Sequence, residues 1–343
     1  MHNNDNKNRS EKILTVIVPA YNMARCLEKN LESYVSPDLF GKLSVIVLDN
    51  SSEDKTLEIA RSFEARYPEI FTVITKPNNG YGGSVNKGIE LTSSKYFKVI
   101  DADDRADTAE LISFVKNLEE CEADVVETPY FTVDAVSGEK IRIDLTADFS
   151  KTNPISAVES QAPFPSLHTT ALRTDFVRRY PFTLLENAYY VDEELAIYPL
   201  FNASTVRAFD NAVYCYSIND ASQSVATKNK VKNLSHRDSI VKRLMKEFYD
   251  GEMKSENRDF CFRRIARSVG DHYTTLYVLH GNKREGRKLA KEFSAYLAEN
   301  YPQFLMATKK KRMLLSILNF FRVSLPFYHR LKKIFGYKEI SSV

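Results

Sequence analysis

The sequence has few cysteines and no long apolar run. Cys26, Cys121, Cys215 and Cys261 are far apart and lack the spacing of metal ligands. No apolar segment reaches the ~18 residues of a membrane span, and the polar first ten residues lack the apolar core of a signal peptide. These absences predict a cytoplasmic protein with reduced cysteines. We expect the polar residues 1–10 to form a disordered tail.

The length and the order of sequence patterns predict an α/β domain followed by helices. With 343 residues and 43% hydrophobic content, the chain is long enough to bury a large core. Strand patterns stop near Lys228, and apolar residues then recur at helical spacing, as at Ile240, Leu244 and Phe248. We expect an α/β domain at 11–227, a helical extension at 228–308 and a basic amphipathic helical tail at 309–343.

Four apolar runs rich in β-branched and aromatic residues alternate with helical patterns in the first hundred residues. The runs cover 14–18, 43–48, 71–74 and 96–100. Strands that alternate with helices form parallel sheets, so the pattern predicts a Rossmann-like, mostly parallel α/β sheet. Farther along, residues 130–134 and 140–144 flank Ser137-Gly138 and predict a β-hairpin.

Three aspartates follow the fourth of these runs directly. Asp101, Asp103 and Asp104 therefore stand at the carboxyl end of a predicted strand, where open α/β sheets bind ligands. Clustered carboxylates repel one another unless a cation neutralises them, and oxygen ligands at this density suit Mg²⁺ or Mn²⁺. An ordinary solvated turn that caps a helix is the alternative interpretation.

Polar motifs also follow the first three predicted strands. They are Pro19-Ala20-Tyr21-Asn22, the turn 49–54 and the glycine-rich segment 79–88. Together with Asp101-Ala102-Asp103, these ordered motifs resemble those of the family-2 glycosyltransferases, over about residues 12–227. The resemblance implies the GT-A fold, which binds nucleotide sugars.

The resemblance also implies a donor site and a metal site. The donor-site residues are Pro19, Ala20, Tyr21, Asn22, Asp49, Asn50, Gly80, Gly82, Asn86, Lys87, Asp101, Ala102 and Asp103. Asp49 resembles the carboxylate that accepts a base N–H, which favours uracil. Asp103 is the first choice as direct metal ligand, while Asp101 holds the metal through water or binds the ribose. Tyr21 alternatively covers the sheet edge, and the glycines alternatively form a plain turn.

Some positions depart from the family pattern. Asn50 and Ser51 stand where Asp-Gly is common, and Val85 stands where a basic residue is frequent. Asn50 keeps the capacity to form hydrogen bonds but removes a charge, which weakens the expected base or ribose contact. The apolar Val85 removes one expected contact to the ribose or diphosphate.

A second acidic motif resembles the acceptor site of the family. It lies within residues 185–194, where Asp192 is the first choice as general base and Glu193 the alternate. Such a base deprotonates the acceptor hydroxyl in an inverting transfer. Carboxylates at a helix start also stabilise the helix dipole without any catalytic role. His168 is a further acceptor-side residue, although a lone histidine is more often structural.

The end of the chain is strongly basic. From residue 309 onward nine basic residues stand against one acid, a net charge of +8, whereas the whole chain carries +3 and the remainder therefore −5. Apolar residues interleave with the basic ones, which is typical of helices that bind anionic membrane surfaces. We expect residues 309–338 to bring a cytoplasmic enzyme to the inner face of the cell membrane. Packing on the catalytic domain or in a homodimer is the alternative, and nucleic acid is not expected because no binding fold is evident.

Taken together, the resemblance implies a metal-dependent inverting glycosyltransferase that uses Mn²⁺ or Mg²⁺. The expected donor is a UDP-sugar, and the expected acceptor is a glycan or a lipid-linked molecule in polysaccharide assembly. A non-catalytic nucleotide-sugar scaffold or sensor is one alternative. A nucleotidyltransferase is less favoured, because the chain lacks an early basic glycine-rich loop for a triphosphate.

Overall fold

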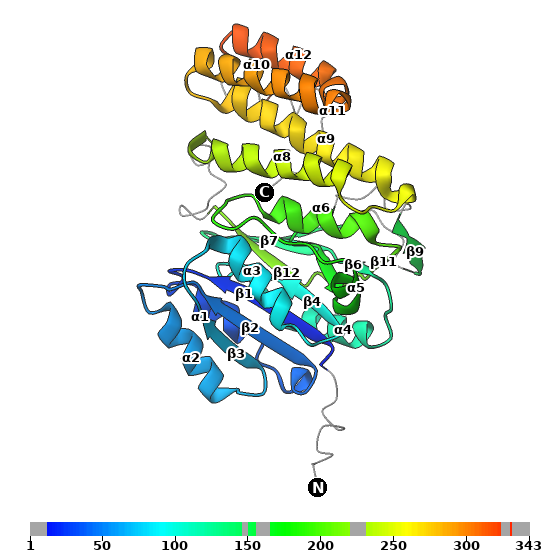
Figure 1. Cartoon of the computed structure of the whole chain (residues 1–343). Coiled ribbons are helices and arrows are strands. Elements are labelled where there is room, and N and C mark those ends of the chain that lie inside the picture. Colours follow the sequence, from blue (N-terminus) through cyan, green and yellow to red (C-terminus); the bar gives the residue numbers. More distant parts are fainter. Residues whose placement is uncertain (1–11, 146–149, 156–164, 220–230, 324–329, 331–343) are drawn as a thin grey trace. The chain divides into compact units, whose positions relative to one another are not determined.

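In the computed structural model the chain divides into two units, Met1–Asp220 and Ala221–Val343 (Figure 1). The structure describes residues 12–145, 150–155, 165–219, 231–323 and 330. The predicted disordered tail at 1–10 lies outside these residues, as does most of the predicted tail beyond residue 323.

Four parallel strands form one half of the main sheet, as predicted. Their order is β3 (Phe71–Thr75), β2 (Leu43–Asp49), β1 (Leu14–Ala20) and β4 (Tyr96–Val99). Every residue of β1 is buried, and it pairs in parallel with both β2 and β4. Continuous apolar runs suit such strands because both faces of a parallel sheet are covered.

Pro19 lies inside β1 although proline cannot donate a ladder hydrogen bond. The carbonyl of Ile17 accepts from the N–H of Ile100, so the backbone at position 17 faces β4. Position 19 faces the same side, but the pairing with β4 covers only residues 14–17 of β1. No ladder donor is needed at Pro19, and the strand can therefore run on to the polar residues behind it.

The rest of the main sheet is mixed. After β4 come β10 (Thr170–Arg173), β6 (Val125–Glu127), β11 (Thr205–Ala208) and β9 (Thr152–Pro154). β10 is antiparallel to both of its neighbours, whereas β6 and β11 are parallel.

A second, four-stranded sheet was not predicted. Its order is β5 (Arg105–Ala106), β12 (Tyr214–Ile218), β7 (Tyr130–Asp134) and β8 (Lys140–Ile143). The antiparallel pair β7 and β8 confirms the predicted hairpin. The parallel pairing of β7 with β12 joins segments that are far apart in the sequence, and local patterns do not reveal such pairings.

Helices connect these strands. They are α1 (Leu27–Glu32), the 3₁₀ turn η1 (Pro37–Leu39), α2 (Thr56–Arg66), α3 (Gly80–Leu91), α4 (Thr108–Glu119), α5 (Thr174–Arg179) and α6 (Asp192–Asn202). α3 begins within the glycine-rich segment, so most of that motif is helical.

The second unit is helical in its described part, as the sequence predicts. Its elements are α8 (Leu234–Asp250), η3 (Ser255–Asn257), α9 (Arg258–Thr274), the π-helical turn η4 (Thr275–Leu279), α10 (Lys283–Asn300), α11 (Pro302–Ala307) and α12 (Lys309–Phe320). Phe304 stacks on Phe262 at 4.7 Å between ring centroids, at the centre of an aromatic core. Within the described ranges, none of the helices has both the length and the apolar character required to cross a bilayer.

Candidate functional site

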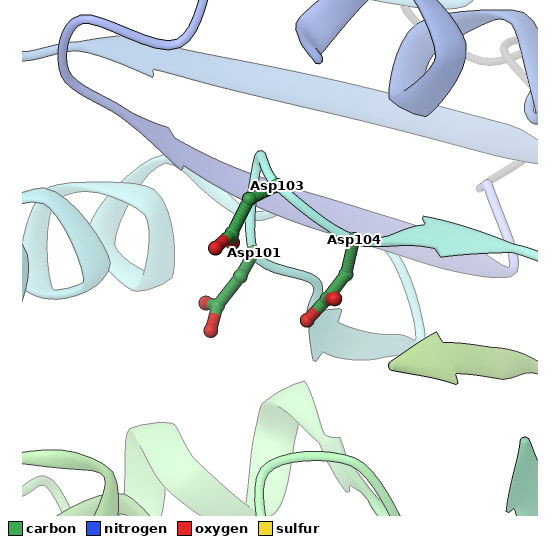
Figure 2. A group of neighbouring side chains, drawn as sticks. All are labelled: Asp101, Asp103 and Asp104. Atoms are coloured by element: carbon green, nitrogen blue, oxygen red, sulfur yellow. The ribbon is translucent and has the colours of Figure 1, made fainter. Parts of the chain in front are cut away.

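The aspartates after β4 lie together at the carboxyl end of the parallel strands. Asp101, Asp103 and Asp104 can each offer a carboxylate oxygen within 4.8 Å of the others. Figure 2 shows the side chains of Asp101 and Asp103 next to each other, with Asp104 beside them. Asn30 of α1 holds the turn, since its amide donates to the carbonyls of Asp101 (3.0 Å) and Asp104 (2.9 Å).

The Asp101 carboxyl is buried beside the carboxylate of Asp103, which disfavours its ionised form. Burial raises the pKa of its carboxyl to about 7, and the Asp103 carboxylate contributes to this increase. The Tyr81 hydroxyl donates to Asp101 Oδ1 at 2.6 Å, which partly stabilises the ionised form. A divalent cation would relieve the remaining repulsion, so this pair of carboxylates fits Mg²⁺ or Mn²⁺.

Asp104 is buried; the sequence placed it in the acidic cluster, but the family resemblance did not include it among the donor-site and metal residues. Tyr214 of β12 donates to its Oδ2 and the N–H of Ser217 donates to its Oδ1, both at 2.6 Å. Burial raises the pKa of this carboxyl well above its usual range, and the charges of Asp103 and Asp101 add to the effect. Asp104 therefore ties the acidic turn to the second sheet. Its place beside Asp103 was the only sign of Asp104 in the sequence, because its partners Tyr214 and Ser217 lie more than a hundred residues away in the chain.

Asp49 ends β2 and is buried with part of its hydrogen-bonding capacity unused. Its Oδ1 accepts from the N–H of Ser52 at 3.3 Å. Its Oδ2 is buried and has no hydrogen-bond partner in the described part of the chain. A buried carboxylate oxygen without a donor is costly, so this atom suits a ligand N–H.

The neighbouring polar residues hold their loops together. Asn50 accepts from Lys76 Nζ at 2.7 Å and donates to Asn78 Oδ1 at 2.8 Å, so its amide is engaged within the protein. Asn22 accepts from the N–H of Glu53 at 2.8 Å, which joins the loops after β1 and β2.

The other predicted donor-site residues differ in their exposure. Pro19, Ala20 and Ala102 are buried, whereas Tyr21 is 41% exposed and its ring is accessible. Lys87 forms an ion pair with Glu90 at 2.7 Å on the partly exposed side of α3.

The glycine-rich start of α3 packs closely on residues 184–187. Gly80 has a φ of +77°, and a Cβ there would lie 2.8 Å from the Asn187 backbone. A Cβ on Gly82 would overlap the carbonyl oxygen of Leu185. Asn86 donates to the Leu184 carbonyl at 3.0 Å and accepts from the Leu184 N–H at 2.9 Å. These three residues thus give α3 a packing role toward another segment, which the sequence analysis did not predict.

Replacing Gly82 with Ala is expected to lower the free energy of unfolding by about 1–3 kcal/mol, because the added methyl displaces the backbone at Leu185. Thermal or urea unfolding measures this change. Gly281→Ala is the matched control, since a Cβ there meets nothing within 4 Å. Equal stability of the two variants would contradict the close packing of α3 on residues 184–187.

Three consecutive acids at the start of α6 have different environments. Glu194 is buried and accepts from the Leu185 N–H at 2.7 Å and from the Tyr198 hydroxyl at 2.9 Å. Glu193 is half-buried, whereas Asp192 is exposed. The charge of Asp192 raises the pKa values of Asp101 and Tyr81, so it lies near the acidic turn. The fold thus brings together two acidic motifs that are about ninety residues apart in the sequence.

His168 belongs to the core. Its ring packs against Tyr130, Tyr214 and Tyr216 at 4.6–5.2 Å between centroids. Burial lowers the pKa of His168 to about 3, and the nearby Lys98 charge contributes to this decrease. A neutral, enclosed imidazole supports the structural interpretation of this histidine.

Comparison with known proteins finds glycosyltransferases that are similar in sequence and in fold. The family described as glycosyl transferase family 2 matches residues 15–180. Glycosyltransferase YibD of Escherichia coli is 22% identical over 67% of this chain and 68% of its own length. The match to the minor teichoic acid biosynthesis protein GgaB of Bacillus subtilis, at 25% identity, covers 49% of this chain but 19% of that protein.

Solved structures share the fold at low identity. S. aureus TarS has a TM-score of 0.63 at 15% identity, over 90% of this chain and 54% of TarS. A TarS 1–349 structure in complex with UDP-GlcNAc has a TM-score of 0.50 at 16% identity, over 89% of this chain and 91% of that one. Mannosyltransferase PcManGT from Pyrobaculum calidifontis, in complex with GDP-Man and Mn²⁺, has a TM-score of 0.53 at 16% identity, over 92% of this chain and 89% of that one.

Proposed function

We propose that the chain transfers a sugar, with inversion, from a UDP-sugar to a glycan or lipid-linked acceptor, because residues 15–180 match glycosyl transferase family 2 and the chain shares its fold with a mannosyltransferase. The observation that carries the proposal is the Asp101–Asp103 pair at the end of β4 with Asp192 nearby. The Asp101–Asp103 pair suits a cation that would neutralise the leaving group, and the separate carboxylate of Asp192 suits removal of a proton from the acceptor. Polysaccharide assembly is the process that such a transfer would serve.

The Asp101 and Asp103 carboxylates are the residues that would hold Mn²⁺ or Mg²⁺. When bound, a divalent cation neutralises the negative charge that develops on a nucleoside diphosphate leaving group. Tyr81 positions the Asp101 carboxylate, because its hydroxyl donates a hydrogen bond to Asp101 Oδ1 at 2.6 Å. Asn30 and Asp104 keep the turn that carries both aspartates in place. The presence of Mn²⁺ in the PcManGT complex, which shares the fold, supports this assignment.

Asp49 and Tyr21 are proposed to bind the base. The unpartnered Asp49 Oδ2 is a hydrogen-bond acceptor, and uracil offers an N–H beside its carbonyls. Tyr21 exposes its ring just beyond β1, where it can stack on a base. The complex of TarS 1–349 with UDP-GlcNAc, again on the same fold, supports a uridine nucleotide.

Asp192 is proposed as the general base. It is exposed at the first position of α6, and its carboxylate would take the proton from the acceptor hydroxyl as that oxygen attacks the sugar. Glu193 remains the alternate in the same turn. Glu194 has a positioning role instead, since both of its oxygens are engaged by Leu185 and Tyr198.

A nucleotide panel tests the proposed donor. We expect UDP and UDP-sugars with Mn²⁺ to give the largest thermal stabilisation, about 5 °C or more at a hundredfold excess over Kd, because a ligand that binds only the folded state stabilises it by about 2.7 kcal/mol. Larger shifts with GDP would overturn the uridine assignment. Equal shifts with and without metal would overturn the metal site.

Release of UDP from the best-bound donor separates an enzyme from a scaffold. The measurement follows free UDP over time in the presence of Mn²⁺ and candidate glycan acceptors. We expect turnover that requires the donor and the metal. Tight binding with no turnover on any acceptor would favour the non-catalytic scaffold or sensor.

A further inference from the structure

The outer side of α12 exposes large apolar side chains. They are Met306 at the end of α11 and Met313, Leu314, Ile317, Phe320 and Phe321 on or directly after α12. Phe320, Phe321 and Met306 are each more than 70% exposed. We call these six residues the α12 face.

The orientation of this face is set by the opposite side of the same helix. Leu315 and Asn319 are buried against the rest of the unit, and Asn319 accepts from Arg287 at 2.7 Å and donates to the Tyr277 carbonyl at 2.6 Å. Lys311 pairs with Asp271 at 2.6 Å. α12 contacts α9, α10 and η4, so the helix cannot turn its apolar residues inward without breaking these interactions.

The charged residues that flank the α12 face along the chain are all basic. Lys309 and Lys310 are exposed at its amino-terminal end, and Arg322 is exposed at its carboxyl-terminal end. None of the three has an acidic partner within the described residues. The sequence from 302 to 323 contains no acidic residue, so the face has no negative charge of its own.

We propose that the α12 face docks on the surface of an anionic lipid bilayer. Leu, Ile, Phe and Met side chains flanked by Lys and Arg match the acyl boundary and the phosphate groups of such a surface. A helix of 12 residues is about 18 Å long, shorter than the ~30 Å hydrocarbon core, so it would lie in the interface and not cross it.

A second copy of the chain fits this face less well. If two α12 faces met, the cations at both ends would approach cations of the partner in either helix orientation, and residues 302–323 contain no acid to offset them. An anionic bilayer offers opposite charge along the whole face. Charge complementarity therefore favours lipid over a homodimer.

Vesicle flotation of the full-length protein tests the proposal. We expect binding to vesicles of phosphatidylglycerol and phosphatidylcholine, weaker binding to pure phosphatidylcholine, and a decrease as salt rises. The double variant I317E/F320E is expected to reduce the partition coefficient at least about tenfold, because it removes apolar burial and adds negative charge. K309Q/K310Q should reduce it about fivefold per charge and weaken the salt dependence.

F40E/V136E is the matched control for the first variant. It also places two glutamates at exposed apolar positions, with Phe40 39% and Val136 86% exposed, but on the other unit. We expect it to bind vesicles like the unchanged protein, and all variants to unfold at similar temperatures. Equal losses for both double variants, or no flotation of the unchanged protein, would overturn the proposal. A change from dimer to monomer in I317E/F320E with unchanged flotation would assign the face to a second copy.

Discussion

Asp103→Asn is expected to raise the melting temperature of the ligand-free protein while it removes the effect of Mn²⁺ on donor binding. The two effects have opposite signs because the Asp103 charge raises the pKa of the buried Asp101 carboxyl, a repulsion that disfavours the folded state until a cation is bound. Sugar transfer should fall at least about a hundredfold, since loss of even an indirect metal contact costs about 10- to 100-fold. Thermal shift with and without Mn²⁺ and UDP measures the melting temperature and the effect of the metal on donor binding, and UDP release measures sugar transfer.

Asp175→Asn is the control for this variant. Asp175 lies on α5 with its side chain 79% exposed, so the same chemical change is made away from the acidic turn. It should leave the metal-dependent shift and the transfer rate unchanged. If Asp103→Asn retained the full Mn²⁺-dependent shift, the Asp101–Asp103 pair would not be the metal site.

Asp192→Asn is expected to reduce sugar transfer by about 10²- to 10⁴-fold, the usual contribution of a general base. Donor binding should change little, because Asp192 lies on α6 and its proposed role is toward the acceptor. Removing the Asp192 charge should slightly lower the pKa of Asp101, and a more fully ionised Asp101 favours metal binding. The measurements are the initial rate of transfer and the UDP-dependent thermal shift on the same preparation.

Glu193→Gln, one position farther along, is the control. It removes the same charge from the same helical turn, so the helix-dipole contribution is matched. If Glu193→Gln loses transfer and Asp192→Asn keeps it, Glu193 is the base. If both variants transfer sugar normally, the base does not come from this turn.

The parallel half of the sheet was predictable because its strands are short, apolar and separated by helical patterns. β1 to β4 lie within two residues of the predicted runs. The second sheet was not predictable, since its central pair, β7 and β12, joins segments over eighty residues apart and requires knowledge of the tertiary fold. For the same reason the sequence did not reveal that Asp104 pairs with Tyr214 and Ser217 of β12.

The sequence located the acidic part of the candidate site, whereas the contacts of its amide residues became visible only in the fold. Asp101 and Asp103 stand where the strand pattern placed them, since the end of β4 is determined locally. Asn50 and Asn86 stay predicted donor-site residues, and the structure adds that their amides bind Lys76 and the Leu184 backbone. An amide can hydrogen-bond to a ligand or to a neighbouring segment, and a glycine can allow either to approach. Only the fold shows which neighbouring segments lie within reach.

Helix α3 has a consequence for how this chain can vary in evolution. Its first turn bears Tyr81, which holds Asp101, and its glycines and Asn86 hold the segment that leads to Asp192. Insertions or deletions between residues 184 and 192 would therefore change the separation of the two acidic motifs. We expect relatives with a larger residue at position 82 to carry compensating changes at position 185, and the length of this connection to vary less than that of the exposed loop between β7 and β8.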